Sequence, residues 1–451
     1  MPLELTKEFI EQTELLIQNE DGKALLKLLE EEHYADVAEL LEDLNFDDAL
    51  YIIKLLDSEK TSDILMELDE DTREEILKNL SVKEIAEELE ELDTDDAADM
   101  ISELPEERQA SVISAIEDAE HKAEIEELLG YDEDTAGGLM AKELVKVYET
   151  WTVAGCLRRI RGQAKDVRRV HSIYVVNKQD QLIGRLSLKD LITAKSDQKI
   201  ADIYISSVDS VHVHDDDEEV AKVMVKYDLE AIPVVDDNNT LLGRITIDDI
   251  VDVLKEEADK DYQLAAGISQ DVEADDTIWQ LTKARLPWLI LGLFGGLGSV
   301  FIMEGYGGIM ANPEFAKLFF FTPLIAAMAG NVGVQSSAII VQGLANDNVK
   351  GSLFRRLLKE VGLSLINGLV LGVLVIIAGY FMNMGIQFSI TIAISMLCVI
   401  IIAALIGTFV PIILDKRGID PAIATGPFIT TSNDIFGIFL FFHIAKLMLG
   451  F

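Results

Sequence analysis

Asp434 is a charged residue inside an otherwise uncharged segment near the end of the chain, ITTSNDIFGIFLFF at 429–442. Four polar residues precede it at 430–433, and Thr431 among them carries a hydroxyl. An ionised carboxylate near the centre of a bilayer costs at least about 2.5–3.5 kcal/mol, so it needs a compensating cation, proton or water. Mg²⁺ usually binds through one or two carboxylates while it keeps several of its waters. These residue types predict a pore metal site at Asp434 and Thr431; the alternative is a protonated Asp434 that is hydrogen-bonded between helices.

A second carboxylate, Asp420, lies fourteen residues before Asp434. This spacing is nearly four helical turns, or about 21 Å, so both carboxylates would lie on one face if a single helix continues through Pro421 and Pro427. Such a stripe, which Thr431 shares, would lead a cation from the cytosolic mouth of a pore to its middle. The alternative is that Asp420 caps the start of the helix, where the helix dipole favours an acid.

The segment GNVGVQSS at 330–337 is another polar patch among apolar residues. Asn331 and Gln335 are four residues apart, so they share a helix face. Gly330 and Gly333 leave room for a neighbouring helix or a hydrated ion to approach the backbone. We expect the two amides to hold the water shell of the pore ion; packing between helices is the alternative.

Long windows without charged residues predict that the last third of the chain crosses a membrane. Basic residues precede the first window, separate the second from the third, and separate the fourth from the fifth. Because cytoplasmic loops are enriched in Lys and Arg, we expect a multi-pass protein of the cell membrane with a cytosolic N-terminus and an external C-terminus. The five windows, each near the roughly 20 residues that span a bilayer, are 288–303, 318–343, 361–382, 388–413 and 421–445.

The rest of the chain is strongly acidic. Of the 80 Asp and Glu residues all but seven precede Pro287, and of the 38 Lys and Arg residues all but eight do so. This negative charge repels nucleic acid phosphates, so no nucleic-acid partner is expected, and divalent cations are the natural partners. Cys156 and Cys398 have no CxxC neighbour, so no disulfide or thiolate metal site is predicted. The N-terminus has no basic region and no apolar core, so no cleaved signal is expected.

A twelve-residue repeat runs through 40–105. Leucines recur at this interval, and each is followed by a residue that commonly begins a helix. The pattern predicts short helices of about two turns, each restarted by a cap and stacked into a small superhelix. Ser81 and Glu84 are expected to form a capping box. The pairs are Leu44 with Asn45, Leu56 with Asp57, Leu68 with Asp69, Leu80 with Ser81, Leu92 with Asp93, and Leu104 with Pro105.

A longer repeat relates SIYVVNKQDQLIGRLSLKDLI at 172–192 to AIPVVDDNNTLLGRITIDDIV at 231–251 with an offset of 59 residues. Each copy reads as a strand, a turn, a Gly-preceded strand, and a Ser or Thr three residues before an Asp at a helix start. The repeat resembles a tandem pair of CBS domains, which implies two βαββα units and binding of an adenine nucleotide such as ATP. The alternative is that the hydroxyl and carboxylate only cap helices. The nucleotide residues would be Ser187, Asp190, Thr246 and Asp249.

A charged connector at 254–288 joins this repeat to the first window. Together with YDEDTAGGLM at 131–140 and DPAIATGPFITTSNDIFG at 420–437, this order resembles the MgtE family of magnesium channels over essentially the whole chain. The resemblance implies a homodimer whose pore lies on the two-fold axis, with Asp434 at the midplane Mg²⁺ site and Asp420 near the cytosolic entrance. It implies a multidomain fold: an acidic all-α superhelical N-domain at 1–135, tandem α+β CBS domains at 136–198 and 199–254, a connecting (plug) helix at 255–286, and a five-helix α transmembrane domain at 287–451.

The same resemblance implies that cytosolic Mg²⁺ closes the channel as negative feedback for magnesium homeostasis. Without divalent ions the like-charged domains repel one another, and bound Mg²⁺ draws them together against the connector. His214 and Lys226 stand where the family pattern has acids, which leaves the number of sensor sites open. The expected sensor residues are Asp95, Asp96, Asp99, Asp216, Asp248, Asp249, Glu256, Glu257 and Asp259.

Two rival classes of function remain open. A coupled exchanger would need a second ion site or a titrating partner at depth in the membrane, and a membrane-tethered nucleotide sensor would need the CBS motif but no pore. An enzyme is not expected, because the histidines have no nucleophile or metal-ligand spacing around them. Those considered are His171, His212, His214 and His443.

Overall fold

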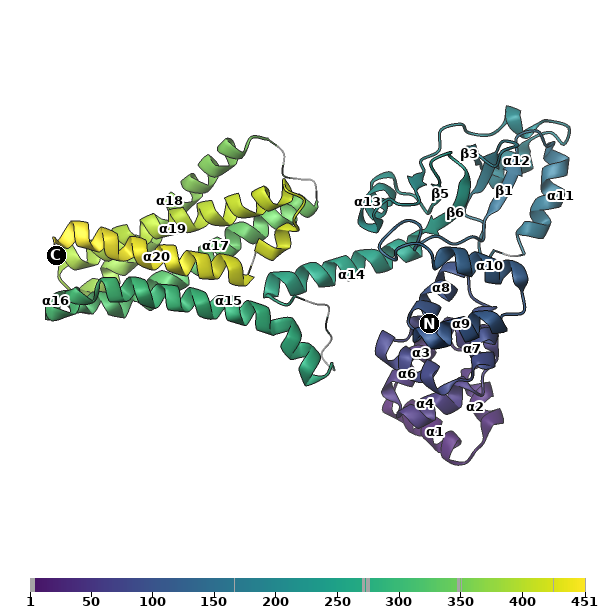
Figure 1. Ribbon diagram of the computed structural model, residues 1–451, viewed down its shortest axis with the longest axis horizontal. Coiled ribbons are helices and arrows are strands. Elements are labelled where there is room, and N and C mark those ends of the chain that lie inside the picture. The colour runs from purple at the N-terminus through teal and green to yellow at the C-terminus, as the bar shows by residue number, and fades with distance from the viewer. Residues whose placement is uncertain are drawn as a thin grey trace. The chain divides into compact units, whose positions relative to one another are not determined.

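The structure is a computed structural model that describes residues 5–165, 167–269, 272, 276–346, 349, 351–424 and 426–450. It forms two compact units, 1–254 and 255–451, whose elements are labelled in Figure 1. The first unit begins with a series of short helices and continues into two small sheets, and the second unit holds long apolar helices.

Short helices form the N-terminal part of the first unit, as the twelve-residue repeat predicts. Asn45, Asp57, Asp69 and Ser81 each occupy an N-cap and accept a hydrogen bond from the backbone N–H three residues later. The predicted capping box is confirmed, because the Glu84 carboxylate accepts a hydrogen bond from the Ser81 backbone N–H at 2.6 Å. The helices are α1 (Lys7–Gln18), α2 (Gly22–Leu29), α3 (Tyr34–Asp43), α4 (Phe46–Ile53), α5 (Ser58–Glu67), α6 (Glu70–Asn79), α7 (Val82–Leu89), α8 (Thr94–Ser102), α9 (Glu106–Ala115) and α10 (Ala119–Leu128).

The leucines of the repeat belong to the core of this helical region. Five of the six are buried: Leu44, Leu68, Leu80, Leu92 and Leu104. The same core continues through Ala136 and Met140 to residues of the second sheet, such as Val234. The helical region and the second CBS-like copy therefore share one hydrophobic core.

Each CBS-like copy forms a three-stranded sheet in which the first pair of strands is parallel and the second pair antiparallel, so the predicted βαββα order is confirmed in both. The first copy comprises β1 (Val145–Tyr148), α11 (Val153–Gln163), β2 (Ile173–Val176), β3 (Leu182–Leu186) and α12 (Leu188–Thr193). The second copy comprises β4 (Val211–His212), α13 (Asp217–Tyr227), β5 (Ala231–Val235), β6 (Leu241–Thr246) and α14 (Ile247–Ala266), and the 3-10 helix Ile200–Asp202 precedes it.

The connector expected at 255–286 is not one separate helix. α14 runs for 20 residues from the second CBS-like copy to Ala266, so the connector begins inside it. The end of the connector lies inside α15 (Ile278–Gly305). Residues 270–271 and 273–275 of the connector lie outside the described residues.

Five helices among the described residues are long and apolar enough to cross a membrane, as predicted. α19 packs against α17, α18 and α20, and α20 also packs against α17 and α15, beside which it runs in Figure 1. The long helices are α15, α17 (Thr322–Ala345), α18 (Leu353–Phe381), α19 (Ile386–Asp415) and α20 (Gly426–Leu449). Short helical turns lie at Gly307–Ala311, Pro313–Ala316 (α16), Lys317–Phe321 and Pro421–Ala424.

Replacement of Ser81 by Ala tests the cap-restarted helices. Loss of an N-cap hydroxyl costs about 1 kcal/mol, which is a factor of about five in an equilibrium. We expect the backbone amides of α7 to exchange with deuterium about fivefold faster in Ser81→Ala, measured on the full chain by hydrogen-exchange mass spectrometry. Ser114→Ala, at an exposed position inside α9, is the control and should change nothing locally, because Ala suits a helix interior. Unchanged exchange of α7 in Ser81→Ala would contradict the capping role.

Candidate functional site

Asp434 lies on α20 close to α17. A Cβ placed on Gly330 would lie 3.9 Å from Asp434 Oδ1 and 3.3 Å from Thr430 Cγ2. A Cβ placed on Gly333 would lie 1.7 Å from Asn433 Nδ2, so only glycine lets the two helices approach this closely. The polar run of α20 and the GNVGVQSS segment of α17 therefore meet inside the membrane unit.

The amides predicted to hold the water shell lie at the surface of α17. Asn331 and Gln335 are exposed in the single chain, whereas Asp434 is half-buried. Thr431 packs against α15, since a Cβ placed on Gly295 would lie 1.8 Å from Thr431 Cγ2. Polar groups on a membrane-spanning helix are tolerated where they face protein or water. We therefore expect the exposed amides to face a polar protein surface or water.

Asp420 lies before α20 and not on it. Residues Pro421–Ala424 form a 3-10 turn, and α20 begins only at Gly426. Asp420 is exposed, and its Oδ1 accepts a hydrogen bond from the Ala422 backbone N–H at 2.7 Å. The predicted stripe of two carboxylates along one continuous helix is therefore wrong. The physical reason is that proline disfavours a helical conformation in the residue before it, and Gly426, which precedes Pro427, has a φ of +23°.

Four of the predicted sensor acids lie close enough to repel one another in the first unit. Asp95 and Asp96 stand in the first turn of α8, Asp99 follows on the next turn, and Asp249 stands in the first turn of α14. Asp95 is buried, Asp96 and Asp249 are half-buried, and Asp99 is exposed. These four residues are called the acid cluster below.

Loss of hydration and mutual repulsion raise the pKa values of the acid cluster. Loss of hydration, and then the charges of Asp249 and Asp93, raise the pKa of Asp96 to about 7. Burial raises the pKa of Asp249 to about 6, although hydrogen bonds from Thr246 oppose the change. The pKa of Asp95 is raised by burial and then by Asp96 and Asp249. These carboxylates therefore gain from a proton or a cation among them.

Two arginines near the acid cluster form their ion pairs with acids outside it, although the charges of Arg168 and Arg244 also lower the pKa values of Asp96 and Asp249 in part. Arg168 pairs with Asp63 at 2.8 Å and with Asp93 at 3.9 Å, and Arg244 pairs with Asp93 at 3.6 Å. Within the described ranges, no side chain forms an ion pair with Asp95, Asp96 or Asp249. The twelve-residue repeat predicted Asp93 only as a helix cap. The local sequence does not indicate that Arg168 and Arg244 pair with Asp93, since both lie far from α8 along the chain.

The remaining predicted sensor acids lie on exposed or half-buried surfaces. Asp216 and Asp248 are exposed at the starts of α13 and α14. Glu256 and Asp259 are exposed on the part of α14 that belongs to the second unit, where Glu257 pairs with Lys260 at 2.7 Å. Their sensor role stays a prediction.

The two copies of the hydroxyl and carboxylate motif differ. Asp249 Oδ2 accepts hydrogen bonds from both the backbone N–H and the hydroxyl of Thr246, each at 2.8 Å. Ser187 is exposed and caps α12 by accepting a hydrogen bond from the Lys189 backbone N–H at 3.1 Å, while Asp190 is half-buried. The capping alternative therefore describes Ser187, whereas the Thr246 hydroxyl donates to Asp249, and a nucleotide role for either copy stays a prediction.

The chain matches known proteins in family, sequence and structure. The family model "Divalent cation transporter" (MgtE) matches residues 322–444, the "MgtE intracellular N domain" matches 32–134, and the CBS domain matches 136–197 and 200–256.

Relatives match most of the chain. It is 38% identical over 334 residues to the magnesium transporter MgtE of Enterococcus faecalis, covering 74% of this chain and 73% of that protein. It is 34% identical over 340 residues to the magnesium transporter MgtE of Thermus thermophilus, covering 74% of each. Among solved structures, the soluble part of a magnesium transporter is 31% identical with a TM-score of 0.51, covering 56% of this chain and 99% of that one. The cytosolic domain of the Mg²⁺ channel MgtE in complex with ATP is 37% identical, also with a TM-score of 0.51, covering 54% and 99%.

The crowded acids predict that the metal-free chain is less stable at pH 8 than at pH 5. The folded-state pKa values of Asp96 and Asp249, about 7 and about 6, exceed the ordinary value near 3.9. Between about pH 4 and 7 the folded state therefore binds more protons than the unfolded state, and stability falls as pH rises through that window. Thermal melting of the protein in chelator at pH 5 to 8 would measure this fall.

A matched pair of variants isolates the acid cluster. Asp96→Asn should flatten the pH dependence of melting, whereas Asp47→Asn, at an exposed position of α4, should leave it as in the wild type. Identical profiles for Asp96→Asn and the wild type would contradict the assignment.

Gly333→Ala tests the close approach of α17 and α20. The new methyl would meet Asn433 Nδ2 at 1.7 Å and Ile429 Cγ2 at 2.8 Å, and such overpacking typically costs about 1–3 kcal/mol. Gly292→Ala in α15, where nothing lies within 4 Å of the added carbon, is the control. We expect Gly333→Ala in detergent to melt at a lower temperature than Gly292→Ala, and equal melting of the two would contradict the packing.

Proposed function

The chain belongs to the MgtE family of magnesium transporters, and on that premise we propose that it is a Mg²⁺-selective channel for magnesium influx. In this proposal Mg²⁺ bound to the acidic cytosolic domains closes the channel. The observation that supports the pore is the carboxylate of Asp434 on a membrane-spanning helix, close to Gly330 of α17. The observation that supports the feedback is the crowding of acids without an ion-pair partner among the described residues of the first unit, Asp95, Asp96 and Asp249.

Asp434 is the proposed ligand of the permeating ion. Mg²⁺ gives up its waters reluctantly, so a site with few carboxylates and several amides or hydroxyls suits the hydrated ion. The exposed amides of Asn331 and Gln335, and the hydroxyl of Thr431, supply such groups on α17 and α20. Asp420, exposed at the start of the last membrane segment, would attract cations at the cytosolic entrance.

A homodimer accounts for the exposed polar surface of α17. In one chain Asn331 and Gln335 are exposed, which is unfavourable if lipid lies against their amides. A two-fold axis beside α17 and α20 would place two such surfaces face to face and double the Asp434 carboxylate around a water-filled path. The basic loops favour a cytosolic N-terminus, so the pore would open toward the acidic domains.

Closure by Mg²⁺ follows from the electrostatics of the acid cluster. Asp95 and Asp96 on α8 and Asp249 on α14 repel one another when all are ionised. A divalent cation among them would offset this repulsion and stabilise the docking of the helical region on the second CBS-like copy. Since α14 continues past residue 254, it can transmit that docking toward the membrane unit. The proposal adds Asp99, Asp216, Asp248, Glu256, Glu257 and Asp259 as further sensor acids.

A nucleotide site is the second proposed function of the CBS pair. The cytosolic domain of a related Mg²⁺ channel has been crystallised in complex with ATP. Thr246 and Asp249 already bond each other, and Asp249 belongs to the acid cluster, which repels phosphates. Ser187 and Asp190 are therefore the better candidates here, and ATP binding should weaken more in Asp190→Asn than in Asp249→Asn.

Mg²⁺ uptake into proteoliposomes tests the pore. Asp434→Asn keeps the size of the side chain and removes only its charge, so we expect uptake to collapse. Asp415→Asn, at the exposed end of α19, is the control and should transport as the wild type does. Wild-type uptake by Asp434→Asn would mean that Asp434 is a protonated packing residue and would overturn the proposed pore.

Protease protection tests the feedback. In the wild type, millimolar Mg²⁺ should protect the connector at 255–286 from cleavage, because the docked state becomes more populated. In Asp96→Asn the Mg²⁺-dependent change should shrink, and in Asp47→Asn it should persist. A wild-type connector that gains no protection from Mg²⁺ would refute closure by this route.

A further inference from the structure

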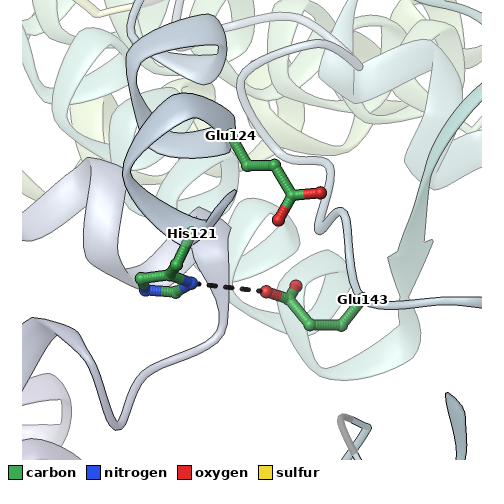
Figure 2. Close-up of side chains that lie close together, drawn as sticks. All are labelled: His121, Glu124 and Glu143. Carbon is green, nitrogen blue, oxygen red and sulfur yellow. Dashed lines mark ion pairs between the residues drawn. The ribbon is translucent and has the colours of Figure 1, made fainter. Parts of the chain in front are cut away.

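Three side chains of metal-ligand type meet beside the helical region, and none of them belongs to the acid cluster. His121 and Glu124 stand one turn apart on α10, and Glu143 lies in the segment that leads into β1. Figure 2 shows the two α10 side chains directed toward Glu143. One ligand atom from each lies within 4.8 Å of the others.

The hydrogen bonding of His121 leaves one ring nitrogen directed at a carboxylate. Nε2 lies 2.9 Å from the Leu89 carbonyl oxygen, which can only accept, so Nε2 carries the hydrogen. Nδ1 lies 4.0 Å from Glu143 Oε1. In the neutral ring Nδ1 is an acceptor, so two electron-rich atoms face each other, and a metal ion between them would bind both. A histidine whose other N–H is held by a backbone carbonyl is the usual arrangement of a metal ligand.

Glu143 is held in place, and both carboxylates are partly removed from water. Glu143 accepts hydrogen bonds from the Thr94 backbone N–H at 3.2 Å and from the Thr94 hydroxyl at 3.0 Å, and its side chain is only 13% exposed. Burial and the charge of Asp93 raise the pKa of Glu143. Burial and then the charge of Glu143 raise the pKa of Glu124. A cation between these groups would offset both costs.

The donor set selects the class of cation. Mg²⁺ prefers oxygen ligands only, whereas an imidazole nitrogen with carboxylates suits Zn²⁺ and neighbouring transition metals. We propose that His121, Glu124 and Glu143 form a site for a divalent transition metal such as Zn²⁺, separate from the Mg²⁺ sites. With metal–ligand distances of about 2.0–2.2 Å, the three ligand atoms would draw about 1 Å closer together than 4.8 Å.

The site would tie together three segments of the first unit. α10 supplies two ligands, the segment before β1 supplies the third, and Glu143 also holds Thr94, the residue before Asp95. A bound transition metal would therefore fix the start of α8, where the acid cluster begins. The inference concerns binding alone and does not depend on the proposed channel function.

Equilibrium dialysis of the purified full-length protein with radioactive Zn²⁺ tests the site. Excess Mg²⁺ is kept present, so that sites built from carboxylates alone are occupied by Mg²⁺. We expect one tightly bound Zn²⁺ per chain, with affinity about tenfold or more weaker in His121→Gln and in Glu124→Gln. Glu126→Gln, at an exposed position of the same helix, should bind as the wild type does.

Two safeguards keep the test decisive. Glu124→Gln leaves the bonds of His121 to Leu89 and of Glu143 to Thr94 intact, so it separates loss of a ligand from loss of structure. Co²⁺ added in place of Zn²⁺ should give a visible absorption band that His121→Gln alters, because a nitrogen ligand is lost. Absence of tight Zn²⁺ binding in the wild type, or unchanged affinity in both ligand variants, would overturn the proposal.

Discussion

A carboxylate that is taken out of water needs positive charge nearby, and this constraint links the functional features of the molecule. This constraint applies to Asp434 on a membrane-spanning helix. It also applies to Asp95, Asp96 and Asp249 in the first unit. Arg168 and Arg244 form their ion pairs with Asp63 and Asp93 and not with these acids. In the proposed function, mobile cations supply the missing positive charge in both places. A protein whose acids bind the ion that it transports could both conduct that ion and respond to its concentration.

The rest of the fold serves to hold these acids in position. Capped helices of two or three turns place the start of α8 beside the start of α14, and a common hydrophobic core fixes the helical region on the second CBS-like copy. In the membrane unit, Gly330 and Gly333 let α17 approach the polar run of α20 closely. In both units the close approach of backbones, and not a strong local attraction, brings the polar groups together.

Periodic features of the sequence were predictable, and long-range contacts were not. The twelve-residue repeat predicted the short helices and their caps, and the uncharged windows predicted the five spans. Both patterns arise from residues that are neighbours in the sequence. The predicted stripe from Asp420 to Asp434 was wrong because the prediction required one helix without a break before Pro427. Arg168 and Glu143 reach their partners only through the tertiary fold. The spacing of His121 and Glu124, one helical turn, can be read from the sequence. Glu143, the third ligand of the proposed metal site, cannot be identified from local spacing.

The most direct test of the account is the current through the reconstituted protein in a planar bilayer, with different Mg²⁺ concentrations on the two sides. A channel compensated by its own ion should reverse its current near the Mg²⁺ equilibrium potential, about 30 mV for each tenfold gradient of a divalent ion. The reversal should not move when proton or sodium gradients are imposed, and the current should fall as Mg²⁺ rises on the side of the acidic domains. A reversal potential that follows protons or sodium, or a current indifferent to Mg²⁺ on that side, would contradict the account.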